Sequence, residues 1–371
     1  MSKITLAPDV SGTGTFTIAA PDSSTDRTLT LPDNSGTVQT ELTNGFGFRN
    51  RLINGNMVLD QRNAGASVTP TAATYTLDRW EFYTTQASKV TYQQNAGGVT
   101  PPAGFKNYLG FTVGASANVT VGASDLFLVD QYIEGYNIAD FGFGAAGASS
   151  VTLSFWVRSS LTGTFGGALT ALSNSRSYPF TYTISAANTW EQKTLTIAGD
   201  TSGTWNSTNL TGLGVRFSLG CGSTYLGTSG AWASAAYFGA TGQTQLVQTN
   251  GATFHITGVQ LEAGSVATAF ERRPYGTELQ LAQRYYERIV SGGTLYVARV
   301  SGVQTYWIGN YKASKRAVPT VSLPAVSTAS DSTSHTPAAM NSTEYGSWYA
   351  TLGGSLTNNV NSFTFVADAE L

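Results

Sequence analysis

Apolar and polar residues alternate along most of this chain. Between about residues 57 and 261, short runs carry Val, Ile, Tyr, Phe or Thr at every second position and end at Gly, Asn or Ser. A period of two residues places the apolar side chains of a strand on one face of a half-buried sheet. The pattern predicts an all-β chain whose central part is a β-sandwich of jelly-roll type.

The predicted strands of this central part share the alternation and are bounded by turn residues. They include Met57–Leu59, Tyr75–Leu77, Trp80–Phe82, Val90–Tyr92, Tyr108–Val113, Ala117–Val121, Phe127–Ile133, Ser150–Val157, Thr181–Ile184, Glu191–Ile197, Gly214–Leu219 and Thr253–Leu261. No period of 20–50 residues recurs, which argues against propellers and solenoids.

Changes in pattern divide the chain into four parts. Residues 1–45 have short strand-like runs with few large apolar residues, so we expect a small β anchor that packs against a partner; the alternative is an unstructured tail. The central domain spans residues 46–273, a linking helix spans 274–290, and a second, smaller β-domain spans 291–371. Within that last part, the polar run around His335 is expected to form a loop.

The linking helix shows helical spacing and a start signal. Thr277 and Gln280 have the spacing of a capping box. Apolar residues then recur at intervals of 3, 4 and 3, which is the seam of a coiled coil. These seam residues are Leu279, Ala282, Tyr286 and Ile289. A single helix that covers a sheet edge is the alternative interpretation.

Charge is scarce except in one place. Only 11% of the 371 residues are charged and the net charge is −2, so we expect no nucleic-acid partner. No apolar run approaches 18 residues, so no membrane insertion is expected. Yet Gly258–Ile289 gathers eight charged residues: Glu262, Glu271, Arg272, Arg273, Glu278, Arg284, Glu287 and Arg288.

Catalytic and metal-binding motifs are absent from the sequence. The single cysteine, Cys221, and the two histidines, His255 and His335, form no recognisable site. We therefore predict no catalytic residue, no metal and no cofactor. A calcium ion bound by loop carboxylates would leave little trace in the sequence; the carboxylates considered for it are Asp60, Asp78, Asp125 and Glu262.

Aromatic residues near Gly-rich and Ser-rich loops are the better candidates for ligand binding. Sugar rings stack their C–H faces on exposed aromatic rings, and four residues lie in such a context: Trp205, Tyr225, Trp232 and Tyr237. Ordinary partial burial is the alternative for each of them.

Several motifs resemble those of bacteriophage tail-fibre and other virion fibre proteins. The segment GTGTFTIAAPDSSTDRTLTLPDNSGTV resembles their N-terminal part. RNRLINGNMVLDQRNAGASVTP and, about 180 residues later, VQLEAGSVATAFERRPYGTELQLAQRYYER are similar to paired motifs of a fibre domain. The closing KRAVPTVSLP and FTFVADAEL are similar to the ends of such proteins. The stretch from about Val113 to Gln248 carries no matching motif.

The resemblance implies a non-enzymatic structural protein of the virion. Such a protein would be a homotrimer, docked to a phage tail or capsid protein through residues 1–45, with a carbohydrate-binding-like jelly roll that attaches to host-surface glycans. The first strand of that jelly roll would lie in NGNMVLDQR. In the trimer, Glu271, Arg272 and Arg273 are expected to form inter-subunit ion pairs around the helical seam. The alternatives are a head-decoration protein without a receptor role and a cell-surface polysaccharide hydrolase.

Overall fold

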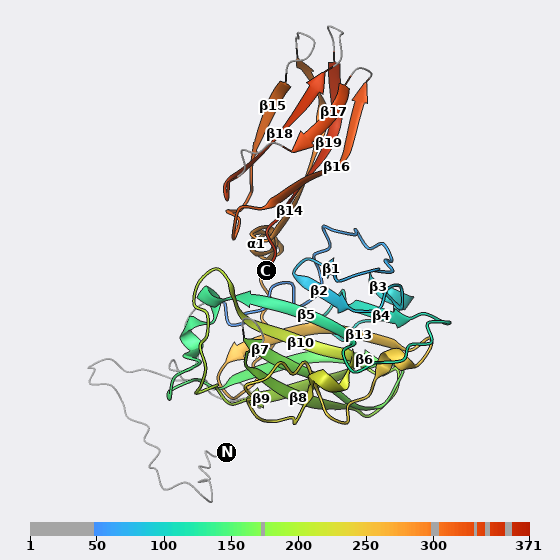
Figure 1. Ribbon diagram of the computed structural model, residues 1–371, viewed down its shortest axis with the longest axis vertical. Helices are drawn as coiled ribbons and strands as arrows, with labels where there is room; N and C mark the ends of the chain where they lie inside the picture. Colours follow the sequence, from blue (N-terminus) through green and yellow to red (C-terminus); the bar gives the residue numbers. More distant parts are fainter. Residues whose placement is uncertain (1–47, 172–174, 298–303, 330–331, 338–341, 353–357) are drawn as a thin grey trace, which may run out of the picture. The chain divides into compact units, whose positions relative to one another are not determined.

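The computed structural model describes residues 48–171, 175–297, 304–329, 332–337, 342–352 and 358–371. The predicted anchor at residues 1–45 lies outside these residues. The described part is all-β apart from one α-helix and short 3-10 turns, which confirms the predicted fold class (Figure 1).

Two antiparallel sheets form the central sandwich. The six-stranded sheet has, in spatial order, β1 (Thr74–Leu77), β2 (Trp80–Thr84), β5 (Leu126–Glu134), β10 (Thr211–Cys221), β7 (Gly163–Ala171) and β8 (Ser177–Ile184). The five-stranded sheet has β3 (Val90–Gln94), β4 (Leu109–Val113), β13 (Thr253–Ala263), β6 (Val151–Ser159) and β9 (Glu191–Ile197). The chain passes repeatedly from one sheet to the other, as in a jelly roll.

The core of the sandwich follows from the alternation in the sequence. On β5, Phe127, Val129 and Ile133 are buried in the core between the sheets. Across the core, the rings of Phe155 and Phe217 meet edge to face at 4.9 Å. Each such pair adds about 1 kcal/mol to the free energy gained by burying its apolar surface.

Two predicted strands are absent because asparagine side chains favour turns there. Residues 56–62 and 114–122 contain no strand. At the first place, Asn54 and Met57 have φ of 58°, and the Asn54 side chain bonds both the N–H (2.9 Å) and the oxygen (2.8 Å) of Leu59. At the second, Asn118 has φ of 44°. Left-handed backbone interrupts an extended strand, so the prediction for NGNMVLDQR was wrong.

Short elements connect the strands of the sandwich. They are the parallel pair β11 (Leu226–Gly227) and β12 (Gly239–Ala240), and the 3-10 turns η2 (Ala96–Gly98), η3 (Gly135–Asn137), η4 (Ala139–Phe141), η6 (Ser223–Tyr225) and η7 (Leu246–Gln248).

Helix α1 (Tyr275–Gln283) follows the sandwich and leads directly into the C-terminal strands. These strands form two antiparallel three-stranded sheets: β14 (Tyr286–Val297), β19 (Asn358–Asp368) and β16 (Thr320–Ala329), and β15 (Gln304–Asn310), β18 (Tyr345–Leu352) and β17 (Ser332–Pro337). The C-terminal strands thus begin five residues before the predicted boundary at 291. His335 lies on a strand, β17, and not in the predicted loop.

Candidate functional site

The charged run after the sandwich is hydrogen-bonded to the start of the sandwich in the same chain. Glu271 accepts the backbone N–H of Asn50 at 3.0 Å. Arg273 donates to the backbone oxygens of Asn50 and Leu52, and it pairs with Glu271 and Glu278 at 3.2 Å each. We call Asn50, Glu271, Arg273 and Glu278 the junction cluster.

This bonding bears on the predicted inter-subunit ion pairs, which stay a prediction. Glu271 and Arg273 already have their partners within one chain. The side chain of Arg272 is exposed and lies over the rings of Phe105 (4.8 Å) and Phe270 (5.7 Å). The charges gather at this point because two segments more than 200 residues apart must be joined, and charge-assisted hydrogen bonds to backbone groups fix their register.

The predicted helical seam is also corrected. Helix α1 ends at Gln283, so Tyr286 and Ile289 belong to β14. Ala282 is fully buried within its own chain, in a cluster with Leu59, to which the half-buried Leu279 adds. The helix begins after Pro274, which has no side-chain cap bond, so the Thr277–Gln280 capping box does not form. The helix thus ends earlier than its spacing indicated, and Arg284, directly after it, pairs with Glu134 of β5.

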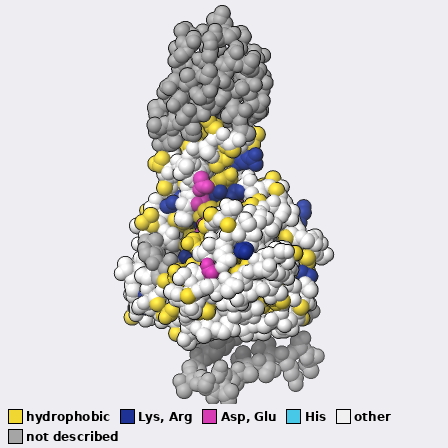
Figure 2. Space-filling model, turned by 45° about the vertical axis from the view of Figure 1, so that its right-hand side comes forward, with side chains coloured by type: hydrophobic (Ala, Val, Ile, Leu, Met, Phe, Trp, Pro, Cys, Tyr) yellow, Lys and Arg dark blue, Asp and Glu magenta, His cyan; other side chains and the backbone are white. Residues whose placement is uncertain are grey.

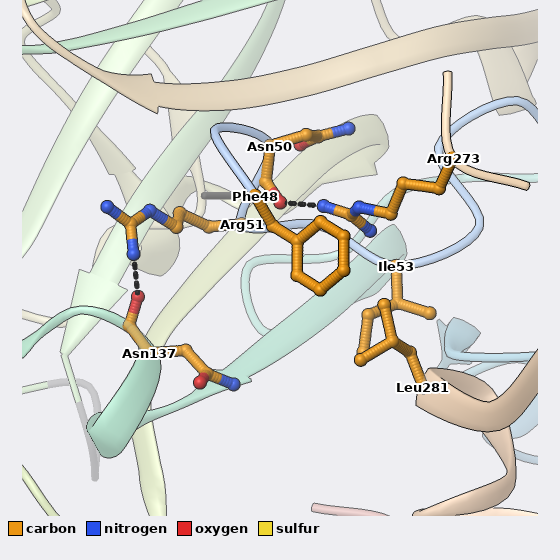
Figure 3. A pocket seen from close by; sticks show the side chains of 7 residues that line it. All are labelled: Phe48, Asn50, Arg51, Ile53, Asn137, Arg273 and Leu281. Carbon is orange, nitrogen blue, oxygen red and sulfur yellow. Dashed lines mark hydrogen bonds between the residues drawn. The ribbon is translucent and has the colours of Figure 1, made fainter. Parts of the chain in front are cut away.

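A small pocket lies beside the junction cluster (Figure 3). Its volume is about 230 Å³, and its lining residues are Phe48, Asn50, Arg51, Ile53, Asn137, Arg273 and Leu281. Both guanidinium groups are engaged, because Arg51 pairs with Asp140 at 2.5 Å and Arg273 belongs to the junction cluster. The pocket thus offers hydrophobic contact and few polar groups free to orient a ligand.

Two of the predicted ligand-binding residues form an aromatic cluster away from this pocket. Trp205 and Trp232 meet edge to face at 5.4 Å, and Phe143 contacts both, at 4.8 and 5.7 Å. Their indole N–H groups donate to the backbone oxygens of residues 202 (3.3 Å) and 198 (2.7 Å). Both tryptophans are half-buried and pack against the sandwich core, and their predicted role in ligand binding stays a prediction.

The other two predicted residues have different surroundings. Tyr237 is half-buried, and its ring packs directly on Gly227. A Cβ atom at position 227 would lie only 2.4 Å from this ring. Tyr225 stacks on Phe238 with ring centroids 5.1 Å apart and 19° between the planes. Tyr225 also lines a pocket.

That pocket, which we call the tyrosine pocket, opens on the outer face of the six-stranded sheet. Its volume is about 310 Å³, and its lining residues are Tyr83, Leu126, Tyr132, Arg216, Tyr225, Ala236 and Phe238. Strand alternation explains the residues that come from β2, β5 and β10. On each of these strands every second side chain points to the core, and the side chains between them point outward into the pocket. A pocket of this size is at the lower end of the range for small-ligand sites.

Arg216 is held at the floor of the tyrosine pocket. Its side chain is 5% exposed. It donates to Tyr132 Oη (2.9 Å) and to Thr170 Oγ1 (3.2 Å), and it lies 3.4 Å from a carboxylate oxygen of Asp130. Its guanidinium lies over the ring of Phe238 at 4.3 Å. These contacts fix the guanidinium and the Tyr132 hydroxyl in one arrangement.

Two carboxyl groups lie in one row with Arg216 across the sheet, on the adjacent strand β5 and on the next strand, β2. Asp130 is opposite Arg216 on one side and opposite Glu81 on the other. Burial raises the pKa of Asp130 to about 6, against the lowering effect of Arg216. Burial and the nearby Asp130 carboxylate together raise the pKa of Glu81 to about 7. The Asp130 carboxylate faces the guanidinium of Arg216 and the hydroxyl of Tyr132.

Sequence reasoning missed most of the tyrosine pocket. Tyr83, Tyr132, Arg216 and Phe238 come from separate strands and loops, and only the sheet order brings them together. A usable signal was present, because Arg216 is a charged residue inside an apolar strand of a chain poor in charge. A buried charge is costly unless it is paired, so such a residue indicates polar partners on the adjacent strands and a polar site around them.

The histidine and the cysteine of the sandwich are both buried. Burial lowers the pKa of His255 to about 4, helped by nearby Arg158, and the His255 ring packs against Tyr108 at 5.3 Å. Burial raises the pKa of Cys221 to about 12. A neutral imidazole and an un-ionised thiol at neutral pH fit a structural role for both side chains.

The candidate calcium ligands are not brought together. No group of three or more His, Cys, Asp or Glu residues within the described ranges could hold a metal ion. Asp60 and Asp125 accept backbone N–H groups of their own loops, Glu262 on β13 accepts the N–H of Thr268, and Asp78 binds Gln61.

The expectation about the membrane concerns helices. Among the described residues, no helix is long and apolar enough to span a membrane.

Comparisons with known proteins give distant structural likenesses. No protein family and no curated sequence matches the chain. A putative sugar-binding protein from Bacteroides thetaiotaomicron is similar over 58% of this chain and 100% of its own, with 11% identity and a TM-score of 0.33. TmCBM61, solved with β-1,4-galactotriose, is similar over 58% and 99%, with 10% identity and a TM-score of 0.29.

A phage protein is similar to the same extent. The enzymatically active domain of tailspike protein 4 from bacteriophage CBA120 matches 58% of this chain, with 13% identity and a TM-score of 0.30. The match spans only 21% of the tailspike chain. At these TM-scores the likenesses carry no argument about function, which therefore depends on the residues described above.

Proposed function

We propose that this protein binds a glycan and that the tyrosine pocket is its binding site. The observation that carries the proposal is the convergence of Tyr83, Tyr132 and Tyr225 around one concave site with Arg216 at its floor. Aromatic faces pack on the C–H faces of sugar rings, while phenol hydroxyls exchange hydrogen bonds with sugar hydroxyls. The Tyr132 oxygen accepts a bond from Arg216 and keeps a second lone pair that can accept a bond from a sugar hydroxyl.

Binding explains this site better than hydrolysis does. A glycosidase needs two carboxyl groups that reach the scissile bond from either side. Here Asp130 has no exposed surface, and Glu81 lies next to it on the adjacent strand. The pair therefore cannot flank a sugar in the pocket, and we propose that the protein is not an enzyme.

We further propose that the chain is a homotrimeric fibre subunit of a phage virion, docked to a tail or capsid protein by residues 1–45. The support for this part is the resemblance of the N-terminal, junction and C-terminal sequence motifs to those of virion fibre proteins. The junction motifs also have a shared structural purpose, because both contribute to the junction cluster that closes the sandwich.

Glycan binding can be tested with tyrosine variants. We expect Tyr83→Ala and Tyr225→Ala each to weaken binding to a glycan identified on an array by about fivefold, since each loses one ring face, worth about 1 kcal/mol. Isothermal titration calorimetry measures the effect. Tyr136→Ala is the matched control, because Tyr136 is 62% exposed and does not line the pocket. Equal affinities for all three variants would rule out this site.

A further inference from the structure

The charges around the tyrosine pocket indicate which glycans it accepts. We propose that the pocket selects neutral saccharides and discriminates against those that carry a carboxylate. This inference rests on the proposed glycan binding at the same pocket, and three features of the structure support it.

The first feature is that Arg216 is already engaged. Its Nε donates to Thr170, one Nη donates to Tyr132, and the other Nη faces Asp130. Phe238 covers the guanidinium plane. A sugar carboxylate is bound best by the open fork of an arginine, through two parallel hydrogen bonds. That fork is occupied here, so Arg216 orients Tyr132 and does not receive an anion.

The second feature is the balance of charge. Arg216 is the one cation among the described residues that line the pocket. Asp130 lies opposite it on the adjacent strand, and Glu81 lies opposite Asp130 on the next strand. The next basic residue that acts on Glu81 is Arg62, which is paired with Asp368 (3.2 Å) and Glu370 (2.9 Å). Once both carboxyl groups are ionised, their charge exceeds that of Arg216 and repels an anionic ligand.

The third feature is the chemistry of the accessible lining. Tyr83 is 37% exposed, and Tyr132 and Tyr225 are half-buried. Tyrosines supply apolar ring faces and uncharged hydroxyls, which match a hexose that carries hydroxyl groups alone. The side chains that a ligand can reach are therefore neutral, and the charged ones lie beneath them.

The test uses matched pairs of oligosaccharides that differ only in oxidation at C6. Galacto-, gluco- and manno-oligosaccharides are each compared with the uronate of the same backbone and length, by calorimetry at about pH 8, where both carboxyl groups are ionised. We expect at least one neutral member to bind, and its uronate to bind at least about tenfold more weakly, as one close like charge predicts.

A charge variant separates repulsion from shape. In Glu81→Gln the pocket keeps its lining, and the ratio of neutral to uronate affinity should fall by at least about fivefold. Glu191→Gln, on β9 of the other sheet, is the matched control and should leave the ratio unchanged. Equal or tighter uronate binding to the natural protein would overturn this inference while leaving glycan binding intact. Failure of every oligosaccharide to bind would overturn the proposed function and this inference together.

Discussion

Lys315 and Glu287 are both fully buried and lie 2.6 Å apart, Nζ to Oε2. Lys315 also donates to the backbone oxygens of Gln283 and Ala313, and Glu287 accepts the backbone N–H of Lys312. Burial lowers the pKa of Lys315, and the bond to Glu287 raises it in part. This buried pair fixes the position of β14 where it follows α1. If the strand moved away, each charge would lose its partner without gaining access to water.

Removing one member of this pair should be costly. We expect Lys315→Met to lower the free energy of unfolding by about 3–5 kcal/mol, because Glu287 keeps its charge without a partner. Urea denaturation followed by circular dichroism measures the change. Lys312→Met, at an exposed side chain that contributes only its backbone N–H, should change stability by less than about 0.5 kcal/mol. A similarly small change in the free energy of unfolding for Lys315→Met would show that the Lys315–Glu287 pair does not stabilise the connection from α1 to β14.

The carboxyl groups at the tyrosine pocket should give stability a specific pH dependence. The pKa of Glu81 is raised to about 7 and that of Asp130 to about 6, so the folded state binds more protons than the unfolded one. The free energy of unfolding therefore falls as pH rises from about 4 to about 7. Glu81→Gln should reduce this fall, with a higher Tm than the natural protein at pH 7 and an equal Tm at low pH.

Glu191 supplies a control of opposite sign. Burial by itself raises the pKa of Glu191, but the bond from Lys193 and the backbone N–H groups of Ala186 and Ser185 outweigh it, and the pKa is lowered overall. Its ionised form thus favours the folded state above the unfolded pKa. Glu191→Gln should lower Tm at pH 7 and lose its effect as the pH falls. The same slope in both variants would contradict these assignments.

At the scale of elements, sequence periodicity predicted the sandwich strands well and α1 poorly. Strands β5, β6, β10 and β13 lie where alternation placed them, because each must bury one face. The heptad spacing in 279–289 is divided between a helix and a strand. Spacing alone could not reveal this, since Arg284 at the helix end is drawn to Glu134 of β5 by two hydrogen bonds of 2.7 and 2.9 Å.

The junction cluster can be tested as a structural element. We expect Arg273→Met to lower the free energy of unfolding by about 3 kcal/mol or more, because Glu271 and Glu278 lose their partner and two backbone oxygens lose a donor. Arg272→Met, at an exposed side chain over two phenylalanine rings, should cost less than about 1 kcal/mol. Loss of oligomers by Arg273→Met without loss of monomer stability would instead support inter-subunit pairing.

At the scale of the whole molecule, the surface is poor in charge. Acidic and basic side chains are sparse on the face seen in Figure 2, and hydrophobic ones occur across it. Several large apolar side chains are more than half exposed, among them Phe48 and Tyr275 near α1. Exposed apolar groups of this kind are compatible with contacts between copies of the chain.

Assembly can be tested by the mass in solution. For the proposed trimer we expect light scattering to give three times 39.0 kDa. Leu279→Asp then tests whether α1 contributes to the interface, because Leu279 is only half-buried within its own chain. Loss of the trimer with an unchanged unfolding midpoint would place α1 at the interface. A monomer for the natural protein would contradict the fibre proposal and leave the glycan proposal standing.

The sequence alone determined the all-β class, the sandwich and the two β-rich regions, because burial on one face imposes a period of two wherever a strand forms. It also marked the charged run as exceptional. The partners of Arg273, the end of α1 and the tyrosine pocket were decided only by the tertiary structure. Each depends on segments that are far apart in the sequence; Asn50 and Glu271, for example, are more than 200 residues apart. Sequence spacing carries no information about which distant groups a buried charge will contact.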